Sequence, residues 1–216
     1  MKKHIFFDLD GTLTDSMPGI VKSVQYALKH YGIDVEDLNE LKPFVGPPLP
    51  ESFNKYYGFS KEQSLEAITV FREYYTDKGW CDNAPYEGIE FVLQNLIASG
   101  KKLYVATSKP EWMAKKVLEY FCLDFYFEFI GGAEMDESRS KKDEVIQYVL
   151  DSCGLKDKED IVMVGDRSHD VIGAHKCGIE AVGVLFGYGD RDELEHAEAE
   201  WITESTMTLG ELLMKL

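Results

Sequence analysis

Two aspartates separated by a single residue, Asp8 and Asp10, follow a short apolar run near the start of the chain. Gly11 comes next, and because glycine lets the backbone turn tightly, both carboxylates can converge on one point. Two carboxylates that lie close together cannot both stay charged cheaply, so either a cation sits between them or one of them holds a proton. The pair is therefore a candidate for metal binding or for acid–base chemistry.

Two further positions carry polar groups that could take part in phosphate chemistry. One follows a predicted strand and carries hydroxyl groups, and the other precedes a predicted helix and carries ammonium groups. Thr107 and Ser108 directly follow the apolar run 102–106, and a hydroxyl there can donate a hydrogen bond to a phosphoryl oxygen. Ser and Thr are also common helix caps, so this signal is weak alone. Lys141 and Lys142 precede a helical pattern, and a lysine there can neutralise charge on a phosphoryl group. A solvated surface lysine is the ordinary alternative.

A second pair of aspartates, Asp166 and Asp170, follows the apolar run 161–164. Asp166 lies on the predicted turn and Asp170 four residues later at the start of a helix, so both side chains can face one cavity. Carboxylate oxygens in an open site favour Mg²⁺. His169 and His175 lack the pairing and spacing of a zinc site, and we interpret them as surface residues or as neighbours of the site.

The elements that must position these residues alternate between strands and helices from residue 87 onward. Apolar runs typical of strands occur at 5–7, 102–106, 127–130, 161–164 and 181–185, with an edge strand at 201–202. This alternation predicts an α/β fold with a Rossmann-like, mostly parallel sheet and helices on both faces. Ligands of such sheets bind outside the carboxyl ends of the strands, where the candidate residues lie.

The apolar residues of the segment 16–85 recur mostly at helical spacing, with no strong strand pattern. The segment is also much longer than a normal crossover inside an α/β unit. Within it, the proline-rich stretch 43–50 is predicted to be a rigid loop. We interpret the segment as a small all-helical cap domain inserted after the first strand, and the alternative is a long helical crossover within one domain. The predicted α/β catalytic core consists of residues 1–15 and 86–216.

Composition narrows the classes of partner. The chain has 216 residues and a formal net charge of −16, from 23 Lys and Arg against 39 Asp and Glu. A surface with this charge repels nucleic acids and anionic membranes, so we expect neither as a partner. The four cysteines form no CxxC pair, and there is neither a secretory signal pattern nor an apolar run approaching the ~18 residues of a membrane span. We expect a cytoplasmic monomer or homodimer.

In type and order, these groups resemble the four motifs of the haloacid dehalogenase superfamily. The first motif, DxDGT, matches residues 8–12, and the fourth, GDxxxD, matches residues 165–170. Thr107 matches the second motif, with Ser108 where relatives often have Asn. Lys142 is the better match to the third motif, although no proline follows it as in many related phosphatases. The helical insert is similar to that of the phosphoglycolate phosphatase branch.

The resemblance implies a covalent phosphatase mechanism. Asp8 would attack phosphorus and become an aspartyl-phosphate. Asp10 would give a proton to the leaving alcohol and then take one from the hydrolytic water. Thr107 and Lys142 would steady the transferring group.

The resemblance also implies a metal and a substrate class. Mg²⁺ would be held by the Asp8 carboxylate, the backbone carbonyl of Asp10 and Asp166, with Asp170 orienting the ligands. The substrate would be a small phosphate monoester, such as a phosphoglycolate-like ester or a sugar or nucleoside monophosphate, selected by the cap. A phosphomutase similar to β-phosphoglucomutase would use the same residues. A non-enzymatic phospho-acceptor signalling domain is the third reading, but such domains are shorter and lack both the insert and GDxxxD.

Overall fold

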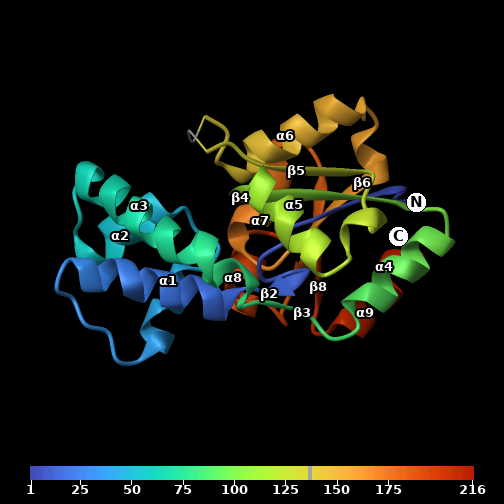
Figure 1. Ribbon diagram of the computed structural model, residues 1–216. Helices are drawn as coiled ribbons and strands as arrows, with labels where there is room; N and C mark the ends of the chain where they lie inside the picture. The colour runs from blue at the N-terminus through green and yellow to red at the C-terminus, as the bar shows by residue number, and fades with distance from the viewer. Residues whose placement is uncertain (136–137) are drawn as a thin grey trace. The chain divides into compact units, whose positions relative to one another are not determined.

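The computed structural model describes residues 1–135 and 138–216 (Figure 1). The chain forms two compact units. One comprises Met1–Thr14 together with Pro85–Leu216, and the other comprises Asp15–Ala84. The chain passes between the units at β2 (Thr14–Asp15) and β3 (Ala84–Pro85), which pair as a two-stranded sheet.

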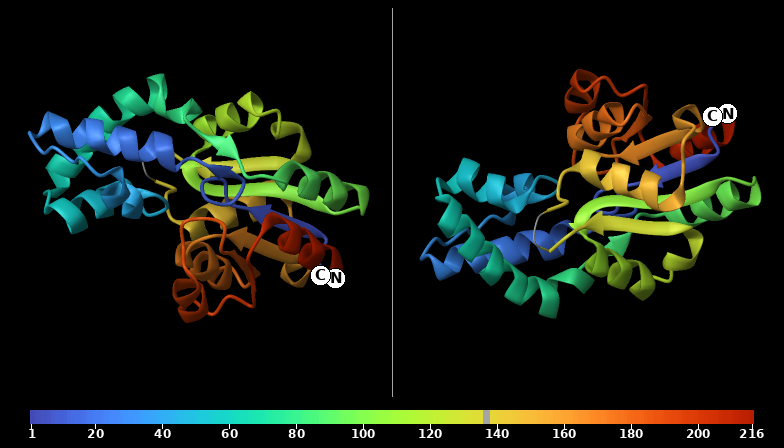
Figure 2. Two further views of the ribbon diagram at one scale, coloured as in Figure 1. Left: turned by 90° about the horizontal axis from the view of Figure 1, so that it is seen from below. Right: turned by 90° about the horizontal axis from the view of Figure 1, so that it is seen from above.

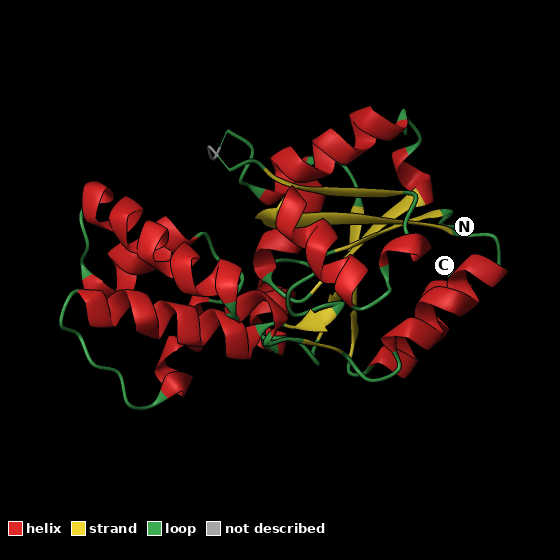
Figure 3. Ribbon diagram, in the orientation of Figure 1, coloured by secondary structure: helices red, strands yellow, loops and turns green. Residues whose placement is uncertain are grey.

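The first unit is built on a six-stranded sheet of order β5-β4-β1-β6-β7-β8, in which every neighbouring pair is parallel (Figure 3). The strands are β1 (His4–Phe7), β4 (Lys102–Pro110), β5 (Phe129–Ala133), β6 (Ile161–Gly165), β7 (Glu180–Val184) and β8 (Trp201–Thr203). The α/β fold with a mostly parallel sheet is thus confirmed, and β8 is an edge strand as predicted. β1 lies between β4 and β6, so its carboxyl end opens in the middle of the sheet.

Helices cover both faces of this sheet, as the two views of Figure 2 show. The covering helices are α4 (Ile89–Ala98), α5 (Glu111–Tyr120), α6 (Lys142–Cys153), α7 (Ser168–Lys176), α8 (Arg191–His196) and α9 (Thr206–Lys215), and the short 3₁₀ helices η3 (Asp124–Tyr126) and η4 (Lys158–Asp160) lie in connections. Phe6, Met163 and Ala181 pack under α6, α7 and α8. Because strand side chains alternate, Phe7 and Val164 face the layer of α4, α5 and α9, and all five side chains are buried.

Two strands extend beyond their predicted ends. The sequence predicts that β4 stops at Ala106, but the strand continues to Pro110 through a register shift against β5. β5 contains Gly131 and Gly132, which the sequence pattern predicts to follow the strand. Both glycines are needed there, because a Cβ atom would lie 2.5 Å from Val149 at Gly131 and 2.6 Å from the backbone of Glu111 at Gly132.

The second unit is helical. It contains α1 (Met17–His30), η1 (Leu38–Phe44), α2 (Leu49–Tyr57), α3 (Lys61–Asp77) and η2 (Gly79–Cys81), where η1 and η2 are 3₁₀ helices. The prediction that 43–50 is entirely a loop is wrong, because Pro43 lies inside η1 and Pro50 lies in the first turn of α2. A proline is tolerated in a first turn, where its missing N–H has no partner to lose. Within the described part of the chain, no helix has both the length and the apolar character that a membrane span requires.

Candidate active site

Five of the predicted site residues meet at the carboxyl edge of the sheet in the first unit. Asp8 follows β1, Thr107 lies in β4, and Asp166 follows β6, while Lys142 and Asp170 lie in the first turns of α6 and α7. The side chains come together because β1 sits between β4 and β6. All five residues are buried, and Asp166 is fully inaccessible to solvent.

Lys142 is the ammonium at the centre of this group. Its Nζ atom lies 2.8 Å from Asp8 Oδ1 and 2.8 Å from Asp170 Oδ1, and it donates a hydrogen bond to the carbonyl oxygen of Ala106. Burial by itself would lower the pKa of Lys142, but Asp170 and Asp8 outweigh that effect and hold the pKa above its ordinary value. Lys141 is exposed. The structure therefore places Lys142, and not Lys141, beside the predicted nucleophile.

Asp8, Asp166 and Asp170 form a buried carboxylate cluster in which one oxygen atom from each residue lies within 4.8 Å of the other two. Burial raises the pKa of Asp8, as does Asp170, against the opposing effects of Lys142 and of a hydrogen bond from Thr107. Burial, Asp170 and Asp8 raise the pKa of Asp166 well above its ordinary value. Three buried carboxylates carry more negative charge than Lys142 can balance, so these residues fit a divalent cation. Their oxygen-only donor set is the one that Mg²⁺ prefers.

Asp166 is fixed from two neighbouring segments. Its Oδ2 atom accepts a 2.8 Å hydrogen bond from the backbone N–H of Tyr188, and the Thr12 hydroxyl lies 3.4 Å from Oδ1. A Cβ atom at Gly11, where φ is +84°, would lie 2.3 Å from the Asp166 carboxylate. A Cβ atom at Gly187 would lie 2.2 Å from the Gly11 carbonyl oxygen. The turn after β1 and the loop after β7 therefore approach the cluster as bare backbone.

Sequence reasoning missed Lys109. Its Nζ atom lies 2.9 Å from both carboxylate oxygens of Asp10, and its side chain is almost fully buried. Alternate residues of a strand share a side, so Thr107 and Lys109 project together once β4 continues past Ala106. That alternation is the signal that could have found it. The side chain of Asp10 is thus held by Lys109 and lies outside the carboxylate cluster, and Asp10 entered the metal prediction only through its backbone carbonyl.

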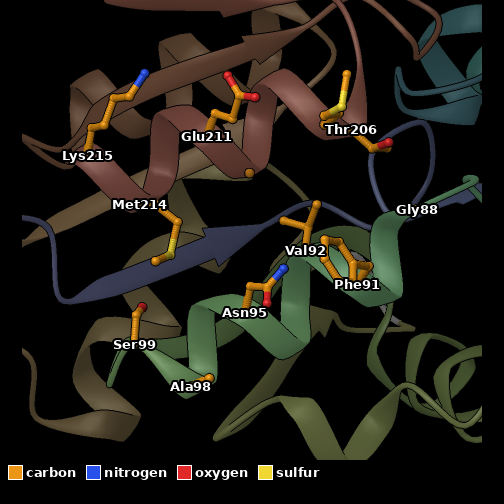
Figure 4. A pocket seen from close by; sticks show the side chains of 12 residues that line it. Gly88, Phe91, Val92, Asn95, Ala98, Ser99, Thr206, Glu211, Met214 and Lys215 are labelled. Carbon is orange, nitrogen blue, oxygen red and sulfur yellow. The ribbon is translucent and has the colours of Figure 1, made fainter.

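A separate groove of about 850 Å³ lies between α4 and α9 (Figure 4). Phe91, Val92, Met207 and Met214 line it, with Glu211 and Lys215 along α9. None of the predicted site residues borders it. The groove therefore belongs to the helical layer that covers the sheet and not to the carboxylate cluster.

Comparison with known proteins assigns the chain to a family. The family model of haloacid dehalogenase-like hydrolases matches residues 5–184. A protein of Pseudomonas aeruginosa named 5′-nucleotidase is 44% identical over 191 residues, which cover 88% of this chain and 86% of that protein. The tyrosine-protein kinase PtkA of Mycobacterium tuberculosis is 41% identical over 208 residues, which cover 96% of this chain and 70% of the kinase.

The fold of the chain is also that of a solved relative. The crystal structure of a predicted phosphatase from Clostridium acetobutylicum matches with a TM-score of 0.97 and 45% identity, and the match covers 100% of both chains. The resemblance drawn from the four motifs is therefore confirmed. By its sequence and by its fold, this chain belongs to the haloacid dehalogenase-like hydrolase family.

Proposed function

We propose that this chain, a phosphoric monoester hydrolase by its family, is a Mg²⁺-dependent phosphatase that works through an aspartyl-phosphate on Asp8. The observation that carries the proposal is the position of Asp8. Its carboxylate lies at the carboxyl end of the central strand, 2.8 Å from the Lys142 ammonium and within the carboxylate cluster with Asp166 and Asp170. A nucleophile, a positive charge for the transferring group and a cation site are thus combined in one place.

In the first half of the proposed reaction, a carboxylate oxygen of Asp8 forms a bond to phosphorus and the bond to the ester oxygen breaks. Asp10 gives its proton to the leaving alkoxide. Lys142 and the Thr107 hydroxyl stabilise the charge that develops on the phosphoryl oxygens. In the second half, water attacks phosphorus and loses a proton to Asp10, the bond to Asp8 breaks, and inorganic phosphate leaves.

Asp8, Asp166 and Asp170 are the side chains that would hold Mg²⁺, together with the backbone carbonyl of Asp10. When bound, the ion supplies positive charge beside the phosphoryl oxygens. It would also offset the mutual repulsion of the three buried carboxylates, whose burial otherwise opposes their ionisation.

Among small phosphate monoesters, nucleoside 5′-monophosphates are the first candidates, because the relative that is 44% identical is named 5′-nucleotidase. Phosphoglycolate-like esters and sugar phosphates remain the other two classes. We propose that the helical unit Asp15–Ala84 is the cap that selects among them, with Pro47 and Leu49 contributing. Their replacement by alanine should shift the preference profile but leave the hydrolysis of a small generic ester largely intact.

The proposed location is the cytoplasm. Cys81, Cys122, Cys153 and Cys177 are all free, as expected in a reducing compartment. The proposed oligomeric state is a monomer or a homodimer, which sedimentation of the purified protein would distinguish.

The test combines a panel of substrates with an experiment that traps the aspartyl-phosphate. The protein is incubated with Mg²⁺ and members of the three substrate classes, and released phosphate is measured. Rapid acid quench of a reaction with ³²P-labelled substrate should give labelled protein whose label is removed by hydroxylamine, as an acyl phosphate is, and Asp8→Asn should carry no label. Hydrolysis without any label on quenched wild-type protein would contradict the covalent route.

Two further arms separate the alternatives. Formation of an isomeric phosphate ester without phosphate release would identify a phosphomutase. Transfer of phosphate from ATP to a tyrosine peptide would extend to this chain the activity for which the relative PtkA is named. Phosphate release alone supports the phosphatase.

A further inference from the structure

We infer that Glu193, a residue of α8 outside the four motifs, is a positioning residue that holds the Asp166–Asp170 segment in its metal-binding geometry. The inference rests on the proposed function, because it concerns the carboxylates that would hold Mg²⁺. It adds a determinant of metal affinity that lies after the fourth motif in the sequence.

The contacts of Glu193 converge on the two residues that follow Asp166. Glu193 Oε1 accepts hydrogen bonds from the backbone N–H and the hydroxyl of Ser168, both at 2.8 Å. The Nε atom of Arg167 lies 3.0 Å from Oε1 and 3.1 Å from Oε2. One carboxylate thus binds three donors between the two aspartates of the fourth motif.

This arrangement replaces a helix cap. α7 begins after Arg167, whose side chain has no acceptor with which to bind the free N–H groups of the first turn. Glu193 supplies an acceptor from another helix, and a carboxylate is favoured at the positive end of the α7 dipole. Asp170 meanwhile accepts a 3.1 Å hydrogen bond from the Arg167 backbone N–H. The residue held by Glu193 therefore also orients a predicted metal ligand.

The loop that leads into α8 also contacts the Asp166–Asp170 segment. Tyr188 donates its backbone N–H to Asp166, and a Cβ atom at Gly189 would lie 2.0 Å from the Asp166 carbonyl oxygen. Asp190 caps α8 by accepting a hydrogen bond from the backbone N–H of Glu193. Burial would raise the pKa of Glu193, but the hydrogen bonds from Ser168 and Arg167 outweigh it and lower the pKa, so the carboxylate is charged at neutral pH.

The test is the affinity for Mg²⁺ itself, measured by isothermal titration calorimetry on protein freed of metal with EDTA. Glu193→Gln keeps the size of the side chain but replaces one carboxylate oxygen by an NH₂ group. That group is itself a donor and cannot accept a hydrogen bond from Arg167 or Ser168. Partners that orient metal ligands change affinity by roughly 10- to 100-fold, so the Kd for Mg²⁺ should rise by at least about tenfold. A Kd within twofold of wild type would overturn the inference.

The matched control is Glu195→Gln on the same helix. Glu195 is exposed and lies 3.7 Å from Arg191, so the variant removes one negative charge without touching α7. Its Kd should stay within about twofold of wild type. Repeating the titrations at about 0.5 M salt screens a long-range charge effect, and the deficit of Glu193→Gln should persist there. A deficit that disappears in salt, or that Glu195→Gln shares, would identify a general charge effect and overturn the positioning role.

Thermal unfolding in EDTA separates a positioning role from a merely structural one. If Glu193 only stabilises the fold, the variant has a lower Tm but an unchanged Kd for Mg²⁺. If Glu193→Gln does not fold, Ser168→Ala takes its place, because it removes one donor to the Glu193 carboxylate. The loss of one hydrogen bond should raise its Kd by roughly 2- to 10-fold, and an unchanged Kd overturns the inference. Wild-type protein that binds no Mg²⁺ would instead refute the proposed function.

Discussion

The ammonium group of Lys109 lies 2.9 Å from each carboxylate oxygen of Asp10. The contact fixes the orientation of the Asp10 carboxylate. A charged Asp10 is the form that accepts a proton from the attacking water in the second half of the proposed reaction. In the first half the same group must give a proton to the leaving alcohol. Lys109 therefore contacts the residue that is proposed to transfer a proton in both steps.

Lys109→Gln should therefore reduce kcat by roughly 10²-fold toward an alkyl phosphate, within the range attributed to general acid–base catalysis. The loss should be much smaller toward p-nitrophenyl phosphate, whose leaving group needs little protonation. Steady-state assays with both esters check this. Lys115→Gln, which removes an exposed partner of Glu111 on α5, is the control and should leave both rates unchanged. Equal losses on the two esters would place the effect of Lys109 in the second half, which both esters share, and unchanged rates on both esters would contradict a role for Lys109.

Asp8→Asn keeps the shape of the side chain but removes the anion that attacks phosphorus. Turnover should fall by at least ~10³-fold, the scale seen when one member of a catalytic unit is removed. The measurement is phosphate release under saturating Mg²⁺, with circular dichroism to verify the fold. Activity within tenfold of wild type would rule out Asp8 as the nucleophile.

EDTA should abolish hydrolysis because it removes the metal, and an excess of added Mg²⁺ should restore the activity. Asp166→Asn should raise the Mg²⁺ concentration needed for half-maximal activity. In EDTA the same variant should unfold at a higher temperature than wild type, because it removes a buried carboxyl group whose ionised form is opposed by burial and by Asp8 and Asp170. We expect a gain of about 2–4 °C, corresponding to about 1 kcal/mol for a protein of this size. Full activity in EDTA would exclude the metal proposal.

The carboxylate cluster could be located from the sequence because its members lie directly after apolar runs or at helix starts, and both signals are local. Strand alternation points to Lys109 only if β4 is taken to continue past Ala106, and that continuation is a consequence of pairing with β5, which no local pattern reports. Glu193 is a similar case. Its partners are set by the packing of α8 beside α7, and no local pattern in the sequence reports that contact.

The pH dependence of stability should contain a contribution from His4. Burial and the charge of Lys102 lower the pKa of His4 in the folded chain below the ordinary value of about 6.5. Below pH 6.5 the unfolded chain therefore binds a proton that the folded chain resists, so this contribution to stability is lost as the pH falls through that range. Urea unfolding should show a larger loss between pH 7.5 and about 5.5 for wild type than for His4→Gln.

The difference between the two proteins should be constant between pH 7.5 and about 8.5, where histidine does not titrate. That upper range is the internal control. Equal losses of free energy of unfolding on acidification would show that His4 does not contribute.

The pairing of β2 with β3 has a consequence for the order in which the chain folds. β1 and its parallel neighbour β4 are separated in the sequence by the whole helical unit, and such distant pairing is slow because the entropy of loop closure must be lost first. Once the helical unit has folded and its two ends have paired, only residues 8–13 and 86–101 remain to be closed between β1 and β4. Folding of the helical unit thus shortens the loop that must close before β1 pairs with β4. The stability of this unit should therefore influence the rate at which the two central strands pair.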